Sequence, residues 1–209
     1  MPNMSDQTVV IENGKKLNDP IYEESIKYCT KEMKHELKRH DLSFDIISDL
    51  PNTFIAGSAV VKSLLRDNKE KTWNNDIDIF CFRKEGEMPV KRNDGPSASI
   101  LSTLIERILR NGYYLNNIHN RYINSNTVYK FWKYDNDKFA LGVRKHLKID
   151  VIDVVLKGEE TAESFFDGFD LSICKNRFDG CSFIVDDFNA AQLGKTLYHC
   201  TNERSRDRK

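Results

Sequence analysis

The chain has 209 residues, of which 39% are hydrophobic and 31% are charged, as in ordinary folded globular proteins. Its 32 Lys and Arg residues balance its 32 Asp and Glu residues, so net charge does not indicate a general binder of nucleic acid or membranes. No apolar run reaches the ~20 residues that a membrane span needs, the N-terminus is too polar for a signal peptide, and the five cysteines are scattered. We therefore expect a cytoplasmic, intracellular protein in a reducing environment, with no membrane partner.

The length predicts a single domain with a proper hydrophobic core. We expect residues 1–18 to be a flexible lead-in, residues 19–200 to form the domain and residues 201–209 to be a frayed tail. Within the domain the pattern predicts three parts: N-terminal helices over 20–50, a core over 52–156, and C-terminal strands and a helix over 160–200.

The first elements are predicted to be helical. Pro20 opens a helical pattern that continues to about His40, and residues 42–50 continue as a second helical piece. Residues 54–57 then form a short apolar strand, and residues 58–66 form the helix that follows it.

The turn between this strand and this helix is a candidate phosphate-binding site. Gly57 has no side chain, so a phosphate could approach the backbone N–H groups there. Ser58 could cap the helix and donate a hydrogen bond to the same phosphate. Lys62 lies one turn further along and is expected to face the same way.

The next strand, residues 76–82, carries two aspartates. Asp76 and Asp78 are two residues apart, so in a strand their carboxylates point to the same face. Like charges held this close repel, and a bound cation is the usual compensation. The pair therefore indicates a candidate metal site.

The rest of the chain alternates between helical and strand patterns. Together with the earlier elements it predicts an α/β (α+β) fold, a mixed β-sheet flanked by helices. The predicted elements are a helix over 99–112, antiparallel strands over 113–117 and 126–134, a strand over 146–155, a helix over 162–169, and strands over 171–177 and 181–185.

The strand over 126–134 is rich in aromatic side chains. Val128, Lys130, Trp132 and Tyr134 alternate with Tyr129, Phe131 and Lys133. One face of this strand is expected to lie in the core, and the other is a candidate platform for a nucleobase.

A third carboxylate lies on the strand over 146–155. Asp150 and Asp153 are three residues apart, so they face opposite ways and only one can join the earlier pair. The face of Asp150 becomes polar toward the start of the strand, whereas Ile149 and Val151 flank the face of Asp153 with apolar side chains. This favours Asp150, and Asp153 stays open.

Three carboxylates on neighbouring strands are typical of a divalent-cation site. Mg²⁺ is commonly held by one or two carboxylates, water and the phosphates of a nucleotide. Two such ions about 3.5–4 Å apart can activate the attacking oxygen and stabilise the leaving oxygen of a phosphoryl transfer. We expect Mg²⁺ or Mn²⁺, two ions in all, at Asp76, Asp78 and Asp150.

These residues together resemble a known family. The order strand, Gly57-Ser58, helix, Asp76-Ile-Asp78 and a distant Ile-Asp150-Val is similar to the signature of the DNA polymerase β-like nucleotidyltransferase superfamily. The resemblance covers about residues 50–155. It implies the nucleotidyltransferase fold in a minimal, single-domain form, because little chain follows Asp150.

The resemblance also implies a function. It predicts a transferase that moves a nucleoside monophosphate from a nucleoside triphosphate such as ATP to a hydroxyl of RNA, protein or a small molecule. Asp76, Asp78 and Asp150 would be catalytic and metal-binding, and Asp150 would help to activate the acceptor hydroxyl. Gly57 and Ser58, with Lys62 beside them, would bind the nucleotide. The alternative is an inactive nucleotide-binding or antitoxin-like partner protein on the same fold.

Overall fold

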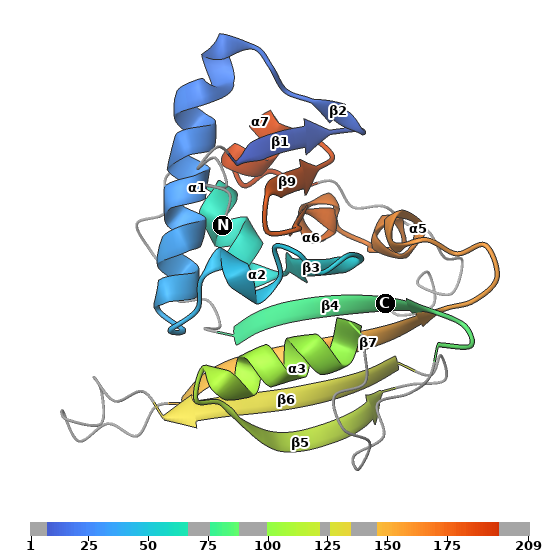
Figure 1. Cartoon of the computed structure of the whole chain (residues 1–209). Helices are drawn as coiled ribbons and strands as arrows, with labels where there is room; N and C mark the ends of the chain where they lie inside the picture. Colours follow the sequence, from blue (N-terminus) through green and yellow to red (C-terminus); the bar gives the residue numbers. More distant parts are fainter. Residues whose placement is uncertain (1–7, 67–75, 88–99, 122–125, 135–145, 197–209) are drawn as a thin grey trace, which may run out of the picture.

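The computed structural model describes residues 8–66, 76–87, 100–121, 126–134 and 146–196. These residues form a mixed sheet of nine strands with helices packed against it (Figure 1). The strands lie in the order β2-β1-β9-β8-β3-β4-β7-β6-β5. The α/β (α+β) class with a mixed sheet flanked by helices is therefore confirmed. The predicted tail at 201–209 lies outside the described residues.

Most neighbouring strands run antiparallel, and the parallel pairs are β4 with β7 and β1 with β9. The described strands are β1 (Val9–Glu12), β2 (Lys15–Lys16), β3 (Thr53–Ala56), β4 (Asp76–Lys84), β5 (Tyr114–Arg121), β6 (Asn126–Tyr134), β7 (His146–Leu156), β8 (Arg177–Phe178) and β9 (Ser182–Val185).

Helices α1, α2 and α3 lie close to their predicted positions. The described α-helices are α1 (Glu23–Lys38), α2 (Ser58–Leu64), α3 (Ile100–Arg110), α5 (Ala162–Asp167), α6 (Ser172–Lys175) and α7 (Phe188–Gln192), and the 3-10 helices are η1 (Pro20–Tyr22) and η2 (Phe44–Ile46). None of these helices is long and apolar enough to pass through a membrane.

The side chains of β4 and β7 divide between two faces of the sheet. One face, the inner face, carries Ile77, Ile79 and Cys81 of β4 and Ile149, Val151 and Asp153 of β7. Its apolar residues are fully buried in the main core with residues of α1, α2 and α3, and Figure 1 shows α3 running along this part of the sheet. Apolar residues alternate with polar ones in the first half of each strand, which made both strands predictable.

The opposite face, the carboxylate face, changes from polar to apolar along the strands. It carries Asp76, Asp78, Phe80 and Phe82 of β4 and Lys148, Asp150, Ile152 and Val154 of β7. Its far half is buried in a second core with Phe166 of α5. Its near half, which holds the aspartates, is only partly buried. The helices thus leave the acidic half of the sheet accessible.

The predicted lead-in is wrong where the structure describes it from Val9 on. β1 and β2 form a hairpin, and β1 joins the sheet beside β9. Asn13 and Gly14 have positive φ angles of 48° and 73°, which suits the tight Asn-Gly turn between two strands. Because Val10 of β1 is fully buried, this hairpin belongs to the domain.

Two further predicted elements differ from the structure. Residues 42–50 contain only η2, and the backbone before Pro51 is disfavoured for helix by the proline ring. Residues 171–177 were predicted to form a strand, but α6 occupies most of them and β8 begins only at Arg177. Leu171 and Ile173 imitate strand alternation there, although Leu171 is exposed.

Candidate active site

The sheet register places the three predicted carboxylates on one face. Asp78 of β4 and Asp150 of β7 are direct partners across two parallel strands, and Asp76 lies opposite Lys148. Neighbouring strands are about 4.8 Å apart, so directly opposed side chains are close neighbours. The carboxylate face therefore brings together Asp76, Asp78 and Asp150.

Asp153 lies on the inner face and has a different partner. Its carboxylate accepts two hydrogen bonds from Arg83 of β4, at 2.6 Å from Nε and 2.7 Å from Nη2. Asp153 is only 2% exposed. Of the two candidates for the third carboxylate, Asp150 is the one on the face of Asp76 and Asp78, and Asp153 belongs to a buried ion pair.

Gly57 lies directly beside the Asp78 carboxylate. Ala56, the last residue of β3, is the register partner of Asp78, and the chain then turns at Gly57 with a φ of 70° and a ψ of −148°. A Cβ at Gly57 would lie 2.6 Å from Asp78 Oδ2. Only glycine can take this conformation and leave this space for the carboxylate.

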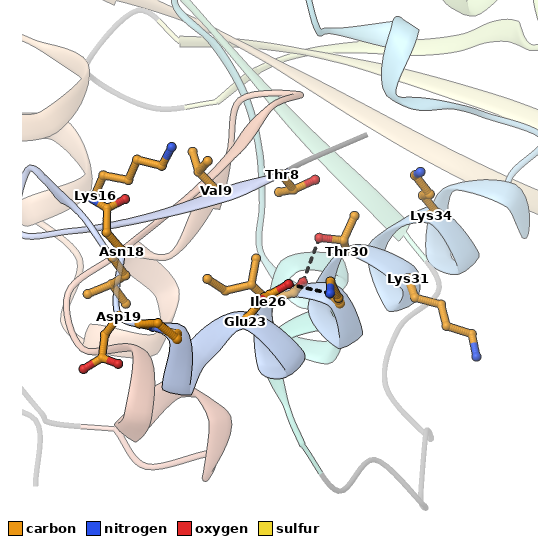
Figure 2. Close-up of a pocket in the computed structure, with 13 residues that line it drawn as sticks. Thr8, Val9, Lys16, Asn18, Asp19, Glu23, Ile26, Thr30, Lys31 and Lys34 are labelled. Atoms are coloured by element: carbon orange, nitrogen blue, oxygen red, sulfur yellow. Dashed lines mark hydrogen bonds and ion pairs between the residues drawn. The ribbon is translucent and has the colours of Figure 1, made fainter. Parts of the chain in front are cut away.

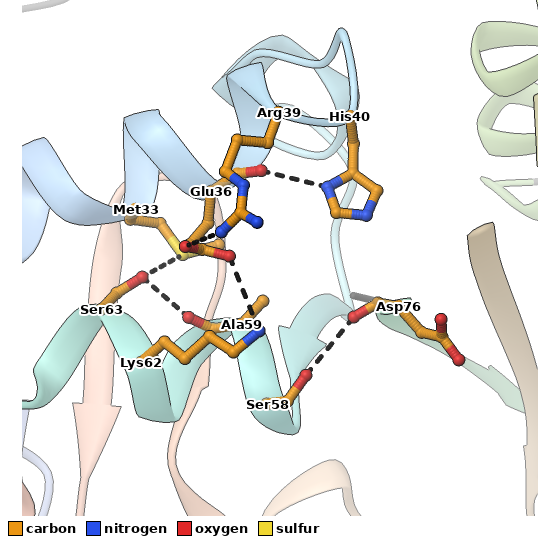
Figure 3. A network of polar contacts seen from close by, with 9 residues as sticks. All are labelled: Met33, Glu36, Arg39, His40, Ser58, Ala59, Lys62, Ser63 and Asp76. Atoms are coloured by element: carbon orange, nitrogen blue, oxygen red, sulfur yellow. Dashed lines mark hydrogen bonds and ion pairs between the residues drawn. The ribbon is translucent and has the colours of Figure 1, made fainter. Parts of the chain in front are cut away.

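Ser58 joins the same turn to the start of β4. Its Oγ donates a hydrogen bond to the backbone oxygen of Asp76 at 3.5 Å (Figure 3). The Gly57-Ser58 turn and the Asp76-Asp78 pair are thus held next to each other.

Lys62 lies in a buried polar network between α1 and α2 (Figure 3). It is only 2% exposed, and its Nζ is 3.9 Å from Oε2 of Glu36. Arg39 donates a hydrogen bond to the other oxygen of Glu36 at 3.1 Å. The structure therefore buries Lys62 against α1 and does not present it at an accessible surface beside Gly57 and Ser58.

Lys130, which belongs to none of the sequence motifs, neutralises the third carboxylate. Lys130 of β6 is the register partner of Asp150, and its Nζ lies 3.1 Å from Asp150 Oδ2. The two-residue spacing of Lys130 and Trp132 places both on the carboxylate face, but only the strand order reveals that Asp150 lies opposite Lys130. A cation already sits beside this carboxylate.

The chemistry of these groups suits a hard divalent cation, since carboxylate oxygens are its preferred ligands. Their present arrangement is looser than a bound site: within the described ranges, no three His, Cys, Asp or Glu side chains are close enough to hold a metal ion. The residues fit Mg²⁺ or Mn²⁺ by type and face, and binding would require the aspartate side chains to turn toward each other.

Two large cavities lie elsewhere in the molecule. One, of about 610 Å³, lies between the β1–β2 hairpin and α1, where Figure 2 shows Lys16, Asp19 and Ile26 among its lining residues. The other, also about 610 Å³, is lined by residues of α6, α7 and the segments around them. Neither of these two cavities is lined by Asp76, Asp78 or Asp150, whose side chains are partly buried on the carboxylate face.

The close approach at Gly57 gives a stability prediction. Gly57→Ala should lower the free energy of unfolding by about 3 kcal/mol, because it adds a strained backbone conformation and displaces the Asp78 carboxylate. Urea unfolding followed by circular dichroism measures this loss.

Gly158 provides the matched control for this substitution. Its φ is +61° and a Cβ there would meet no atom within 4 Å. Gly158→Ala should therefore cost only about 1 kcal/mol, the penalty of a left-handed backbone. Equal losses at both glycines would contradict the tight packing of Gly57 against Asp78.

The fold and this site define an α/β protein with an acidic cluster on the accessible half of a mixed sheet. A comparison with protein families matches residues 24–191, from α1 to α7, to the family described as "Gad2: Gabija anti-defense 2 family protein". The chain belongs to this Gad2 family. A search among curated proteins finds no match to the chain.

Proposed function

We propose that the chain is a metal-dependent nucleotidyltransferase of the DNA polymerase β-like type. The main support is the direct pairing of Asp78 with Asp150 on neighbouring strands, on the face that also carries Asp76. The approach of Asp78 to Gly57 adds to it, because a glycine turn beside carboxylates suits a triphosphate bound through a cation.

Each residue then has a role in the proposal. Asp76 and Asp78 would hold two Mg²⁺ or Mn²⁺ ions, and Asp150 would also hold the ion on the acceptor side. The bound ions would lower the pKa of the acceptor hydroxyl and neutralise charge on the triphosphate. Gly57 and Ser58 would contact the triphosphate. Lys130 would move from Asp150 when that carboxylate takes a cation, since both compete for the same oxygen.

The proposed reaction is an in-line substitution at phosphorus. Asp150 accepts a hydrogen bond from the acceptor hydroxyl and orients its oxygen toward the α-phosphorus of the nucleoside triphosphate. A bond forms between the acceptor oxygen and the α-phosphorus, and the bond from that phosphorus to the bridging oxygen breaks. Pyrophosphate leaves with the electron pair, and the hydroxyl proton passes to water at the open face.

The alternative is a nucleotide-binding or antitoxin-like partner protein that no longer catalyses transfer. The contact of Lys130 with Asp150 supports it, because a fixed internal cation could replace the metal there. The two candidates differ in their need for metal: the enzyme requires a divalent cation for activity, whereas the partner protein can act without one.

The family name suggests the setting of this activity. Since the Gad2 family is described as Gabija anti-defense, we propose that the transferred nucleotide inactivates a component of Gabija or a molecule on which Gabija depends. In cells that carry Gabija, the wild-type chain should then reduce the protection that Gabija gives.

A transfer assay tests the proposal. The chain is incubated with nucleoside triphosphates labelled at the α-phosphate and with RNA, protein or small-molecule acceptors. Label should appear on an acceptor with Mg²⁺ or Mn²⁺ and disappear when EDTA removes the metal. Transfer that persists in EDTA would contradict the metal mechanism, and nucleotide binding without transfer to any acceptor would support the partner protein.

A further inference from the structure

The accessible half of the carboxylate face continues beyond the aspartates into a row of rings. Trp132 and Tyr134 of β6 lie opposite Lys148 and His146 of β7, and Tyr114 of β5 lies opposite Trp132, so all five side chains share one face. The ring centroids of Trp132 and His146 are 5.0 Å apart, and those of Tyr134 and His146 are 4.8 Å apart. We call Tyr114, Trp132, Tyr134 and His146 the ring platform.

The ring platform lies on the opposite side of the carboxylates from Gly57. The strand order runs from β3, which ends before Gly57, through β4 and β7 to β6 and β5. Asp78 and Asp150 therefore lie between the Gly57-Ser58 turn and the platform. A triphosphate at the turn and a second molecule on the platform would meet at these two carboxylates.

The platform is exposed and has a cation beside it. Tyr134 is 52% exposed and Tyr114 is 39% exposed, and their ring centroids are 6.3 Å apart. Lys148 places its Nζ 5.8 Å from the centroid of the Trp132 ring. An ammonium group next to accessible rings can pair with a phosphate while a base stacks beside it.

We propose that the ring platform binds a nucleobase at the end of a single-stranded nucleic acid and that this end is the acceptor of the transferred nucleotide. Every base has a π-face, so stacking suits acceptors of varied sequence. Lys148 pairs with the phosphate next to the stacked base, and the terminal hydroxyl then reaches Asp150. The identity of the acceptor rests on the proposed transferase function, whereas the binding can be measured without it.

The test uses the full chain with Trp73→Phe, which leaves Trp132 as its single tryptophan. Short single-stranded oligonucleotides are titrated without nucleoside triphosphate or divalent metal, and quenching of Trp132 fluorescence reports binding. An abasic oligonucleotide of the same length should bind about tenfold or more weakly, because the stacked base is missing. Tyr134→Ala should weaken binding of the intact oligonucleotide by about tenfold as well.

Leu109→Ala is the matched control, because it removes a similarly exposed apolar side chain from α3, which packs on the inner face. It should leave oligonucleotide binding unchanged. Equal affinity for the intact and abasic oligonucleotides would overturn the inference, as would tighter binding of a Ser- and Tyr-containing peptide. If oligonucleotides bind as expected but no nucleotide is transferred, the platform stands as a binding site and only the transferase function fails.

Discussion

Asp78→Asn should lower nucleotidyl transfer by about 10³-fold while the protein remains folded. Asparagine keeps the size of the side chain but removes the negative charge that would hold both proposed ions. The loss of several kcal/mol of transition-state stabilisation corresponds to this factor. The measurement is the rate of label transfer from the α-labelled triphosphate under saturating metal.

The stability of the same variant separates catalysis from folding. Asparagine has almost the same size as aspartate, and Asp78 lies on the partly buried half of the carboxylate face, so the substitution leaves no cavity. The free energy of unfolding of Asp78→Asn should therefore stay within about 1 kcal/mol of the wild type. An inactive variant that is as stable as the wild type indicates a chemical role for Asp78.

Glu159→Gln is the control for loss of a carboxylate. Glu159 is exposed in the turn after β7, nine residues after Asp150, and the substitution again exchanges an acid for its amide. Its transfer rate should equal that of the wild type. If Asp78→Asn transferred nucleotide at the wild-type rate, the proposed function would be abandoned. If Asp78→Asn and Glu159→Gln lost activity equally, the loss would reflect the net charge of the protein and not the position of Asp78.

The shared face of the aspartates was predictable from the sequence because successive side chains of a strand point to opposite faces. Alternation placed Asp76 and Asp78 on one face of β4, and the apolar neighbours of Asp153 favoured Asp150 as the third carboxylate while leaving Asp153 open. Both conclusions need only the two-residue period of a strand and the rule that apolar faces are buried.

The rest depended on contacts between distant segments. Lys62 was expected beside the phosphate turn, but its neighbour is Glu36 of α1, which no local pattern could identify. Lys130 lies beside Asp150 only because β6 pairs with β7 in one particular register. The same register brings Trp132 and Tyr134 next to His146, so the ring platform also became visible only in three dimensions.

Arg83→Met should lower the free energy of unfolding by about 3–5 kcal/mol, because it leaves the Asp153 carboxylate buried without its partner. The environment is strongly dehydrated: burial raises the pKa of the neighbouring Cys81 thiol to about 12, and the Asp153 carboxylate adds to this shift. Burial also raises the pKa of Asp153, against the hydrogen bonds from Arg83. Urea unfolding at neutral pH measures the loss.

Two comparisons show whether burial causes the effect of Arg83→Met. The double variant Arg83→Met/Asp153→Leu removes both charges, so it should regain most of the lost stability, since a buried ion pair can often be replaced by apolar side chains of similar size.

Arg107 makes a similar two-bond contact with Asp49 at the surface, at 2.6 and 2.8 Å. Arg107→Met should therefore cost only about 1 kcal/mol. If Arg107→Met were as damaging as Arg83→Met, or if the double variant recovered nothing, burial of the Asp153 charge would not explain the loss.

The same variant also tests whether nucleotidyl transfer depends on the contact between Arg83 and Asp153. Asp150 lies three residues before Asp153 on the same strand, so the transfer rate of a folded Arg83→Met variant measures this dependence.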